Sequence, residues 1–202
     1  MTKIKLCGLL RHCDIEAANQ LGPDYIGFVF SPSSRRYIPP EKAMELKRVL
    51  SPEIQAVGVF VNEAPDKVAG LLKNDVIDVA QLHGNEDENY MKQLRRLTDK
   101  PIMKAFRIET VSDIQRAEQC TADHILLDSG AGTGTVFDWS LIQHVKRPYF
   151  LAGGLTLENV GDAVKMLHPY AVDVSSGIET DQYKDKNKMA MFVAAVRKEG
   201  RL

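Results

Sequence analysis

Cys7 and Asp128 are candidates for proton-transfer chemistry, because each ends a short apolar run, Ile4–Cys7 and His124–Asp128. General acid–base catalysis needs one group that gives a proton and another that takes one, on different sides of a substrate. Cysteine is a base only as a thiolate, and its free pKa of about 8.5 requires a site that stabilises the anion. Aspartate has a reference pKa of about 3.9, so Asp128 acts as an acid near neutral pH only where burial or an anionic neighbour favours its protonated form.

Each residue alone also fits a simpler interpretation. Cys7 fits a buried apolar thiol, and Asp128 fits the first residue of a turn. The sequence after Asp128, Gly130-Ala131-Gly132-Thr133-Gly134, consists almost entirely of glycine and small residues. This is typical of a buried strand that delivers an acid to a ligand-contacting loop.

Further polar and glycine residues follow other apolar runs. Gly153-Gly154 and Ser175-Ser176-Gly177 would gather backbone N–H groups and hydroxyls around one point, which suits phosphate. Two tight turns are the alternative. Arg36 follows another run, and its guanidinium suits a carboxylate or phosphate, whereas Arg35 fits a solvated basic loop. His83 is a candidate proton shuttle or a hydrogen-bonded core histidine.

Eight short apolar runs rich in Val, Ile, Phe and Leu are predicted to be strands covered on both faces. They are Ile4–Cys7, Tyr25–Phe30, Ala56–Val61, Val76–Leu82, Ile102–Phe106, His124–Asp128, Tyr149–Ala152 and Val172–Ser175. Amphipathic segments between them predict helices, with Thr156 as an expected N-cap. These segments are Asp14–Leu21, Pro40–Leu50, Ala64–Leu72, Asp87–Leu97, Ser112–Cys120, Leu157–Leu167 and Asp185–Val196.

The alternation of strand and helix fits a closed (β/α)8 barrel or an open doubly wound sheet. An open sheet needs two edge strands, and Ile4–Cys7 and Val172–Ser175 are too apolar for edges. The segment Gly130–Thr135 is a poor match to a dinucleotide-binding fingerprint. We therefore predict an α/β protein with a single (β/α)8 TIM barrel over residues 1–202, whose carboxyl strand ends form the active-site face.

Composition narrows the function classes. The chain has 202 residues, of which 44% are apolar and 26% charged, with a net charge of -1. We expect no nucleic-acid or membrane partner, and a cytoplasmic location because no secretory signal begins the chain. Cys7, Cys13 and Cys120 do not suggest a disulfide framework or a zinc site, and Cys13 and Cys120 are expected to fill helix interiors. We expect a monomer, with a dimer as the alternative.

The chain resembles the phosphoribosylanthranilate isomerase family of tryptophan biosynthesis along almost its whole length. The matching stretches are Lys5-Leu6-Cys7-Gly8-Leu9, Gly27-Phe28-Val29-Phe30, Ser34-Arg35-Arg36-Tyr37-Ile38, Val57-Gly58-Val59-Phe60-Val61, Gln81-Leu82-His83-Gly84, Leu126-Leu127-Asp128-Ser129, Gly132-Thr133-Gly134, Phe137-Asp138-Trp139, Leu151-Ala152-Gly153-Gly154-Leu155 and Asp173-Val174-Ser175-Ser176-Gly177-Ile178-Glu179.

The resemblance implies a (β/α)8 fold, no cofactor and an Amadori rearrangement of the small-molecule substrate N-(5′-phosphoribosyl)anthranilate. It implies that Asp128 is the general acid on the furanose oxygen and Cys7 the general base at C2′. It further implies that Arg36 holds the anthranilate carboxylate and that Asp173 supports the substrate. We also expect His83 to be a substrate-binding residue. The phosphate-binding residues that the resemblance implies are Gly132, Gly134, Gly153, Gly154, Ser175 and Ser176.

Two departures concern the phosphate loop: the segment after Asp128 is short, and Thr135 stands where a lysine is sometimes found. Two alternatives remain open. A histidine-pathway isomerase barrel performs the same rearrangement, but uses an aspartate where Cys7 stands and has two similar halves. A phospholigand-binding barrel without catalysis would not need both Cys7 and Asp128.

Overall fold

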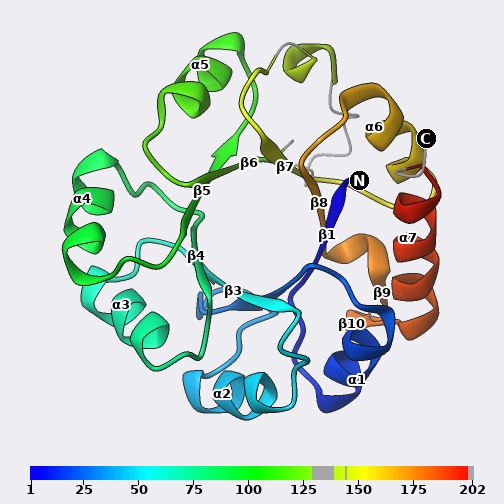
Figure 1. The fold of residues 1–202 in the computed structure, drawn as a ribbon, viewed down its shortest axis with the longest axis horizontal. Helices are drawn as coiled ribbons and strands as arrows, with labels where there is room; N and C mark the ends of the chain where they lie inside the picture. Colours follow the sequence, from blue (N-terminus) through cyan, green and yellow to red (C-terminus); the bar gives the residue numbers. More distant parts are fainter. Residues whose placement is uncertain (129–138, 144, 200–202) are drawn as a thin grey trace.

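A computed structural model describes residues 1–128, 139–143 and 145–199 of the chain. Eight parallel strands form a closed barrel in chain order, with β1 hydrogen-bonded to β8 (Figure 1). The strands are β1 (Lys3–Cys7), β2 (Tyr25–Val29), β3 (Gln55–Phe60), β4 (Val79–Leu82), β5 (Ile102–Arg107), β6 (His124–Asp128), β7 (Tyr149–Ala152) and β8 (Ala171–Val174). The predicted barrel is confirmed.

Helices surround the barrel, and each lies outside the strands that it connects (Figure 1). They are α1 (His12–Leu21), α2 (Pro40–Arg48), α3 (Pro65–Lys73), α4 (Glu88–Leu97), α5 (Val111–Gln119), α6 (Val160–Leu167) and α7 (Lys186–Glu199). The C-terminal α7 lies between α1 and α6 and completes the ring. Between β6 and β7 the described residues form a short 3-10 helix, η1 (Trp139–Ile142). After β8 come the 3-10 helix η2 (Ser176–Ile178) and a small hairpin of β9 (Glu179–Thr180) and β10 (Tyr183–Lys184).

Two of the predicted elements begin three residues later than expected. The helix predicted from Leu157 begins at Val160, and Thr156 is not its N-cap. The Asn159 side chain explains this, because it accepts from Thr156 N (2.8 Å) and donates to Gly154 O (2.9 Å), which holds the preceding residues in a turn. The strand predicted from Val76 begins at Val79, because Asp78 binds the Ala56 amide and Lys47 through its side chain.

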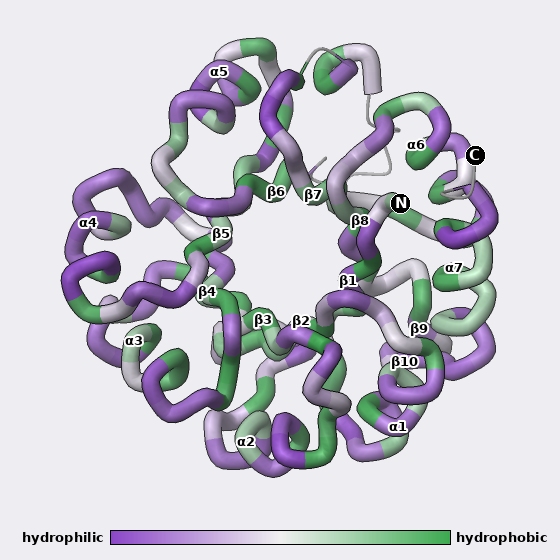
Figure 2. Tube along the Cα trace, in the orientation of Figure 1, coloured by the Kyte–Doolittle hydropathy of each residue, from purple (hydrophilic) through white to green (hydrophobic). Residues whose placement is uncertain are grey.

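The core has two layers. The larger layer lies between strands and helices, and Figure 2 shows the hydrophobic residues gathered along the strands and the helix sides facing them. The smaller layer fills the barrel, where Tyr25 and Phe150 pack edge to face at 5.3 Å. Because side chains alternate along a strand, Ile4 and Leu6 of β1 belong to the outer layer. Lys3, Lys5 and Cys7 therefore face the barrel interior.

The cysteines differ from their predicted environments. Cys13 is exposed on α1, so the prediction that it fills a helix interior was wrong. Cys120 is buried but caps the end of α5 instead of lying within it. Trp139 is half-buried and packs against the core. Among the helices of the described residues, none is long and apolar enough to span a bilayer.

Candidate active site

A pocket of about 440 Å3 opens at the carboxyl ends of the barrel strands. Its lining includes most of the site residues that the sequence suggested: Cys7, Arg36, His83, Asp128, Gly153, Gly154, Asp173, Ser175 and Ser176. Gly132 and Gly134 lie outside the described residues. The strand ends thus bring together side chains from distant parts of the sequence, as expected for this edge of a parallel barrel.

Cys7 is the last residue of β1 and is 8% exposed. Room for its thiol comes from Gly27 on β2, where an added Cβ would lie 2.5 Å from Cys7 Sγ. Val29 and Val59 form an apolar cluster with Cys7. Burial raises the pKa of the Cys7 thiol, and although Lys5 and Lys184 act against this effect, the pKa remains above its ordinary value.

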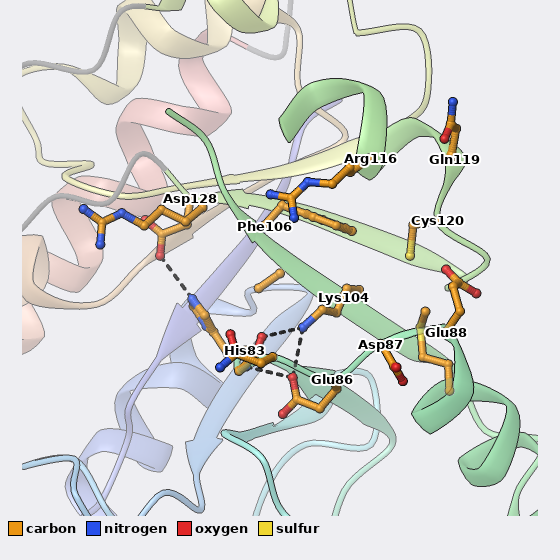
Figure 3. Close-up of a pocket in the computed structure, with 15 residues that line it drawn as sticks. His83, Glu86, Asp87, Glu88, Lys104, Phe106, Arg116, Gln119, Cys120 and Asp128 are labelled. Atoms are coloured by element: carbon orange, nitrogen blue, oxygen red, sulfur yellow. Dashed lines mark hydrogen bonds and ion pairs between the residues drawn. The ribbon is translucent and has the colours of Figure 1, made fainter. Parts of the chain in front are cut away.

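Asp128 ends β6 and faces His83 across the mouth of the barrel, with 3.3 Å between Asp128 Oδ2 and His83 Nε2 (Figure 3). The other ring nitrogen, Nδ1, lies 3.0 Å from Gln81 Nε2. Because an amide nitrogen only donates, Nδ1 accepts and the proton of a neutral His83 lies on Nε2, facing Asp128. His83 is exposed at the mouth and lines the pocket, so it is not a buried core histidine.

Arg36 reaches the pocket over Gly8, where an added Cβ would lie 2.5 Å from Arg36 Cδ. Its guanidinium binds Glu179 through two bonds, Nε to Oε1 at 2.6 Å and Nη2 to Oε2 at 2.9 Å. Arg35 and Lys184 also bind Glu179, each at 2.6 Å. Burial alone would raise the pKa of Glu179, but hydrogen bonds from Arg36 and Lys184 outweigh burial and lower it. Arg36 is therefore held rigidly at the mouth.

The loops after β7 and β8 approach each other closely. Gly153 and Gly154 have φ values of 88° and 63°, in the left-handed region that glycine adopts without strain. A Cβ at Gly177 would lie 2.1 Å from Leu155 O, so only glycine allows this contact. Ser175 Oγ donates to Cys7 O at 3.0 Å, whereas Ser176 is exposed beside it. The Ser175 hydroxyl thus serves the protein scaffold.

Four polar residues that sequence reasoning missed complete the site: Lys5, Gln81, Glu179 and Lys184. Lys5 Nζ binds Asp173 Oδ2 at 2.6 Å inside the barrel, next to Cys7. The sequence did contain a signal for Lys5. A lysine two residues before Cys7 points to the same side of the strand as Cys7, and a buried lysine needs a partner. Its partner, 168 residues away, could not be read from spacing.

Two buried acceptors in this pocket lack a donor among the described residues: Gln81 Oε1 and Asp173 Oδ1. Gln81 is 1% exposed and Asp173 9% exposed. Buried polar atoms are normally hydrogen-bonded, and an unpaired one costs about 1–3 kcal/mol. Both atoms are therefore placed to accept hydrogen bonds from a ligand.

A second cavity of about 1000 Å3 adjoins the first and shares His83 and Asp128 with it. Lys104 and Glu86 are among the residues that line it (Figure 3). Lys104 Nζ donates to Glu86 Oε2 at 2.9 Å and to Gly84 O at 2.7 Å, which fixes the loop that carries His83. In the described part of the chain, no group of three or more His, Cys, Asp or Glu side chains is arranged to hold a metal ion.

Comparison with known proteins agrees with this geometry. Residues 4–195 match the family model "N-(5'phosphoribosyl)anthranilate (PRA) isomerase". An N-(5′-phosphoribosyl)anthranilate isomerase of Caldanaerobacter subterraneus is 45% identical over 98% of both chains. The crystal structure of phosphoribosyl anthranilate isomerase from Thermotoga maritima has a TM-score of 0.90 at 36% identity, covering 98% of this chain and 100% of that one. A phosphoribosyl anthranilate isomerase in complex with reduced 1-(o-carboxyphenylamino)-1-deoxyribulose 5-phosphate has a TM-score of 0.88 at 36% identity, with the same coverage. This chain therefore belongs to the N-(5′-phosphoribosyl)anthranilate isomerase family.

Proposed function

We propose that Cys7 and Asp128 are the general base and general acid of the phosphoribosylanthranilate isomerase reaction, the activity of the family to which the chain belongs. The reaction converts N-(5′-phosphoribosyl)anthranilate to 1-(2-carboxyphenylamino)-1-deoxyribulose 5-phosphate, a step of tryptophan synthesis. The observation that carries the assignment is that both side chains line one pocket, from β1 and from β6.

Asp128 performs the first step. Its protonated carboxyl gives a proton to the furanose ring oxygen, the C1′–O bond breaks, and the nitrogen lone pair forms a protonated imine at C1′. Asp128 is left as a carboxylate. The His83 N–H that faces Oδ2 then donates to a full negative charge, and such charge-assisted hydrogen bonds are stronger than neutral ones. His83 therefore favours the state after proton transfer.

Cys7 performs the second step. Its thiolate takes the proton from C2′, the C2′–H electron pair forms the C1′–C2′ double bond, and the imine π electrons return to nitrogen. The enolamine so formed tautomerises to the ketone. Val29 and Val59 pack against Cys7, and these apolar side chains keep water from the thiolate. The reaction needs a proton donor and a proton acceptor, and the two residues supply both.

The two ends of the substrate have separate contacts. We assign the phosphate to the loops after β7 and β8, with N–H groups of Gly153, Gly154 and Ser176, together with Gly132 and Gly134 as the resemblance implies. Arg36 takes the anthranilate carboxylate with the N–H groups that Glu179 does not use. Its rigid attachment to Glu179 reduces the ordering needed on binding.

The sugar lies between these ends, where Gln81 Oε1 and Asp173 Oδ1 are unpaired acceptors. We assign them to the hydroxyls of the ribose, which are hydrogen-bond donors. Gln81 is fixed by His83 and Asp173 by Lys5, so each acceptor has a set direction. This arrangement extends the predicted substrate contact of Asp173 to a second residue.

The test is loss of anthranilate-adduct fluorescence when purified protein meets freshly prepared phosphoribosylanthranilate, without added metal or cofactor. Cys7→Ala and Asp128→Asn should each lower turnover by about 10²–10⁴-fold, the usual contribution of a general acid or base. Cys13→Ala is the matched control, because Cys13 is exposed on α1. Near-normal turnover in either variant would show that the substituted residue does not have the role assigned to it.

The same samples separate the remaining possibilities. A folded wild-type protein that binds a phosphorylated product analogue without turnover would be a binding barrel.

For the assembly we propose a monomer, as expected from the sequence, and analytical ultracentrifugation distinguishes it from a dimer. The Thermotoga maritima isomerase is described as dimeric, so a dimer is the outcome that would contradict us.

A further inference from the structure

Two buried ammonium groups lie beside Cys7, and the acid–base pair uses neither. Lys5 is completely buried, and its Nζ contacts both the Cys7 thiol and Asp173 Oδ2. Lys184 approaches from β10 with a side chain that is 2% exposed. Its Nζ donates to Ser175 O at 2.8 Å and to Ser175 Oγ at 3.2 Å, and that hydroxyl donates to Cys7 O. Lysines of this kind are rarely buried without a function or a set of partners.

The charges around Cys7 do not balance while it is a thiol. Three cations, Lys5, Lys184 and Arg36, stand against two carboxylates, Asp173 and Glu179. A buried excess charge is costly in a low-dielectric site. Ionisation of Cys7 adds one negative charge and makes the cluster neutral.

The other charged groups near the cluster do not change this balance. Arg35 binds Glu179 from the solvent side and is half exposed, so water screens its charge. His83 and Asp128 line the pocket from other strand ends and pair with each other. The excess charge is therefore specific to the surroundings of Cys7.

We propose that Lys5 and Lys184 are positioning residues that lower the cost of ionising Cys7 to its thiolate, Lys5 by direct contact and Lys184 by its charge behind Ser175. This inference rests on the proposed role of Cys7 as the base. In the reaction the S–H bond forms as the C2′–H bond breaks, and both lysines remain ammonium ions throughout. Asp173 keeps Lys5 protonated and directed at the thiol.

Opposing effects set the pKa values of these groups, and the pKa of Lys184 is lowered by burial although Glu179 and Cys7 raise it. Burial raises the pKa of Cys7, whereas Lys5 and Lys184 lower it and Asp173 raises it. Burial lowers the pKa of Lys5, but Asp173 and Cys7 outweigh burial, so the pKa of Lys5 is raised and its ammonium persists. Without the two cations, burial would act on the thiol unopposed.

The test is the rate at which iodoacetamide alkylates Cys7 as a function of pH, in the absence of substrate. Trypsin cleaves after Arg11, so mass spectrometry reads Cys7 and the exposed Cys13 on separate peptides, and Cys13 serves as the internal reference. In Lys5→Met and Lys184→Met, alkylation of Cys7 at pH 7 should be slower by about 10-fold or more, because each pKa unit is a tenfold change in thiolate. Rates of the variants and the wild type should converge at high pH.

Two further variants sharpen the result. Lys104→Met removes another buried, ion-paired ammonium that lies against Glu86, and should leave the Cys7 alkylation profile unchanged. Lys184→Arg keeps the charge and should return the profile toward the wild type. Turnover should fall in Lys5→Met and Lys184→Met, and KM should rise by a smaller factor, because Lys5 holds Asp173 and Lys184 holds Glu179 at the substrate site.

A wild-type alkylation profile in the folded variants would overturn the proposal, even where turnover falls. If Lys5→Met does not fold, Lys184→Met decides alone, because Lys184 lies outside the barrel strands. Failure of the proposed function is a different result: Cys7→Ala would remain active, whatever the alkylation profile shows.

Discussion

His83 connects Gln81 to Asp128 through its two ring nitrogens, with Nδ1 3.0 Å from Gln81 Nε2 and Nε2 3.3 Å from Asp128 Oδ2. The Gln81 amide sets the tautomer of His83, and the tautomer sets which ring atom carries the proton that faces Asp128. An N–H group directed at a carboxyl interacts more strongly once that carboxyl has lost its proton. With Asp128 as the proposed acid, we expect His83 to act on the transition state more than on the bound substrate.

His83→Ala should lower kcat by about 10-fold or more and leave KM almost unchanged. A hydrogen bond to a charged group contributes about 1.5–3 kcal/mol, and about 1.4 kcal/mol corresponds to a factor of ten. Steady-state kinetics by the fluorescence assay measures both constants. In the Asp128→Asn background the same substitution should cost much less, because the two residues act as one unit. Additive losses would show that His83 works through some other contact.

Arg36→Ala should mainly raise KM, by about 10-fold or more, because it removes a contact that substrate and transition state share. Arg36→Lys should also raise KM, since a lysine cannot bind Glu179 and a second carboxylate with a planar fork. Glu179→Gln should produce an intermediate effect by loosening Arg36.

Arg35→Ala is the matched control for this series. Arg35 binds the same Glu179, but its side chain is 46% exposed, and exposed pairs contribute little. Its KM should stay close to the wild-type value. If the Arg35 and Arg36 substitutions raised KM equally, the substrate carboxylate would not be bound by Arg36 specifically, but by the loop that carries both residues.

The barrel, and the position of Cys7 and Asp128 at one face of it, could be predicted from local sequence. Each strand is a short apolar run, and Cys7 and Asp128 each end one, so strand direction alone places them at the same face. The contacts behind them could not be predicted. Lys5 meets Asp173 only because barrel closure pairs β1 with β8, and Arg36 meets Glu179 across 143 residues.

The errors at the ends of elements arose where a side chain binds backbone groups that the predicted helix or strand would otherwise use. Leu157 continues the apolar pattern of α6, but the Asn159 side chain binds backbone groups on its N-terminal side and delays the helix. Cys13 lies on α1 but is exposed, and the residue type alone does not show which side of a helix faces the core. Side chains that bind backbone compete with periodicity, and periodicity was the only signal available.

Asp113 should make stability depend on pH at the start of α5. Its carboxylate accepts from Glu109 N at 3.0 Å, Thr110 N at 2.8 Å and Thr110 Oγ1 at 2.9 Å. Burial raises the pKa of Asp113, but these bonds and Arg116 outweigh burial and lower it to about 2. Since the folded pKa lies below the unfolded value, the stabilisation is complete above about pH 4 and is lost as pH falls toward 2.

Asp113→Ala should therefore lower the free energy of unfolding by about 0.5–2 kcal/mol at pH 7, the usual contribution of a helix cap. The difference from wild type should shrink as urea unfolding is repeated between pH 7 and pH 3. Glu16→Ala, at an exposed position of α1, should show a small and constant difference. A penalty of equal size at both ends of the range would mean that the cap does not depend on charge.

Gly177→Ala should weaken phosphate binding by separating the loops after β7 and β8. The added methyl would lie 2.1 Å from Leu155 O, which is backbone and cannot rotate away, so one loop must move. Overpacking of this kind costs about 1–3 kcal/mol of stability. Inhibition by inorganic phosphate should need a higher concentration, and KM should rise more than kcat falls.

Gly70→Ala is the control for this substitution. Gly70 lies in α3, and an added Cβ there meets nothing within 4 Å. Alanine in a helix should raise the free energy of unfolding by about 0.5–1 kcal/mol and leave phosphate inhibition unchanged. If Gly177→Ala lost stability but kept the wild-type phosphate inhibition, the contact between the two loops would support the fold alone, and the phosphate site would lie elsewhere at the mouth.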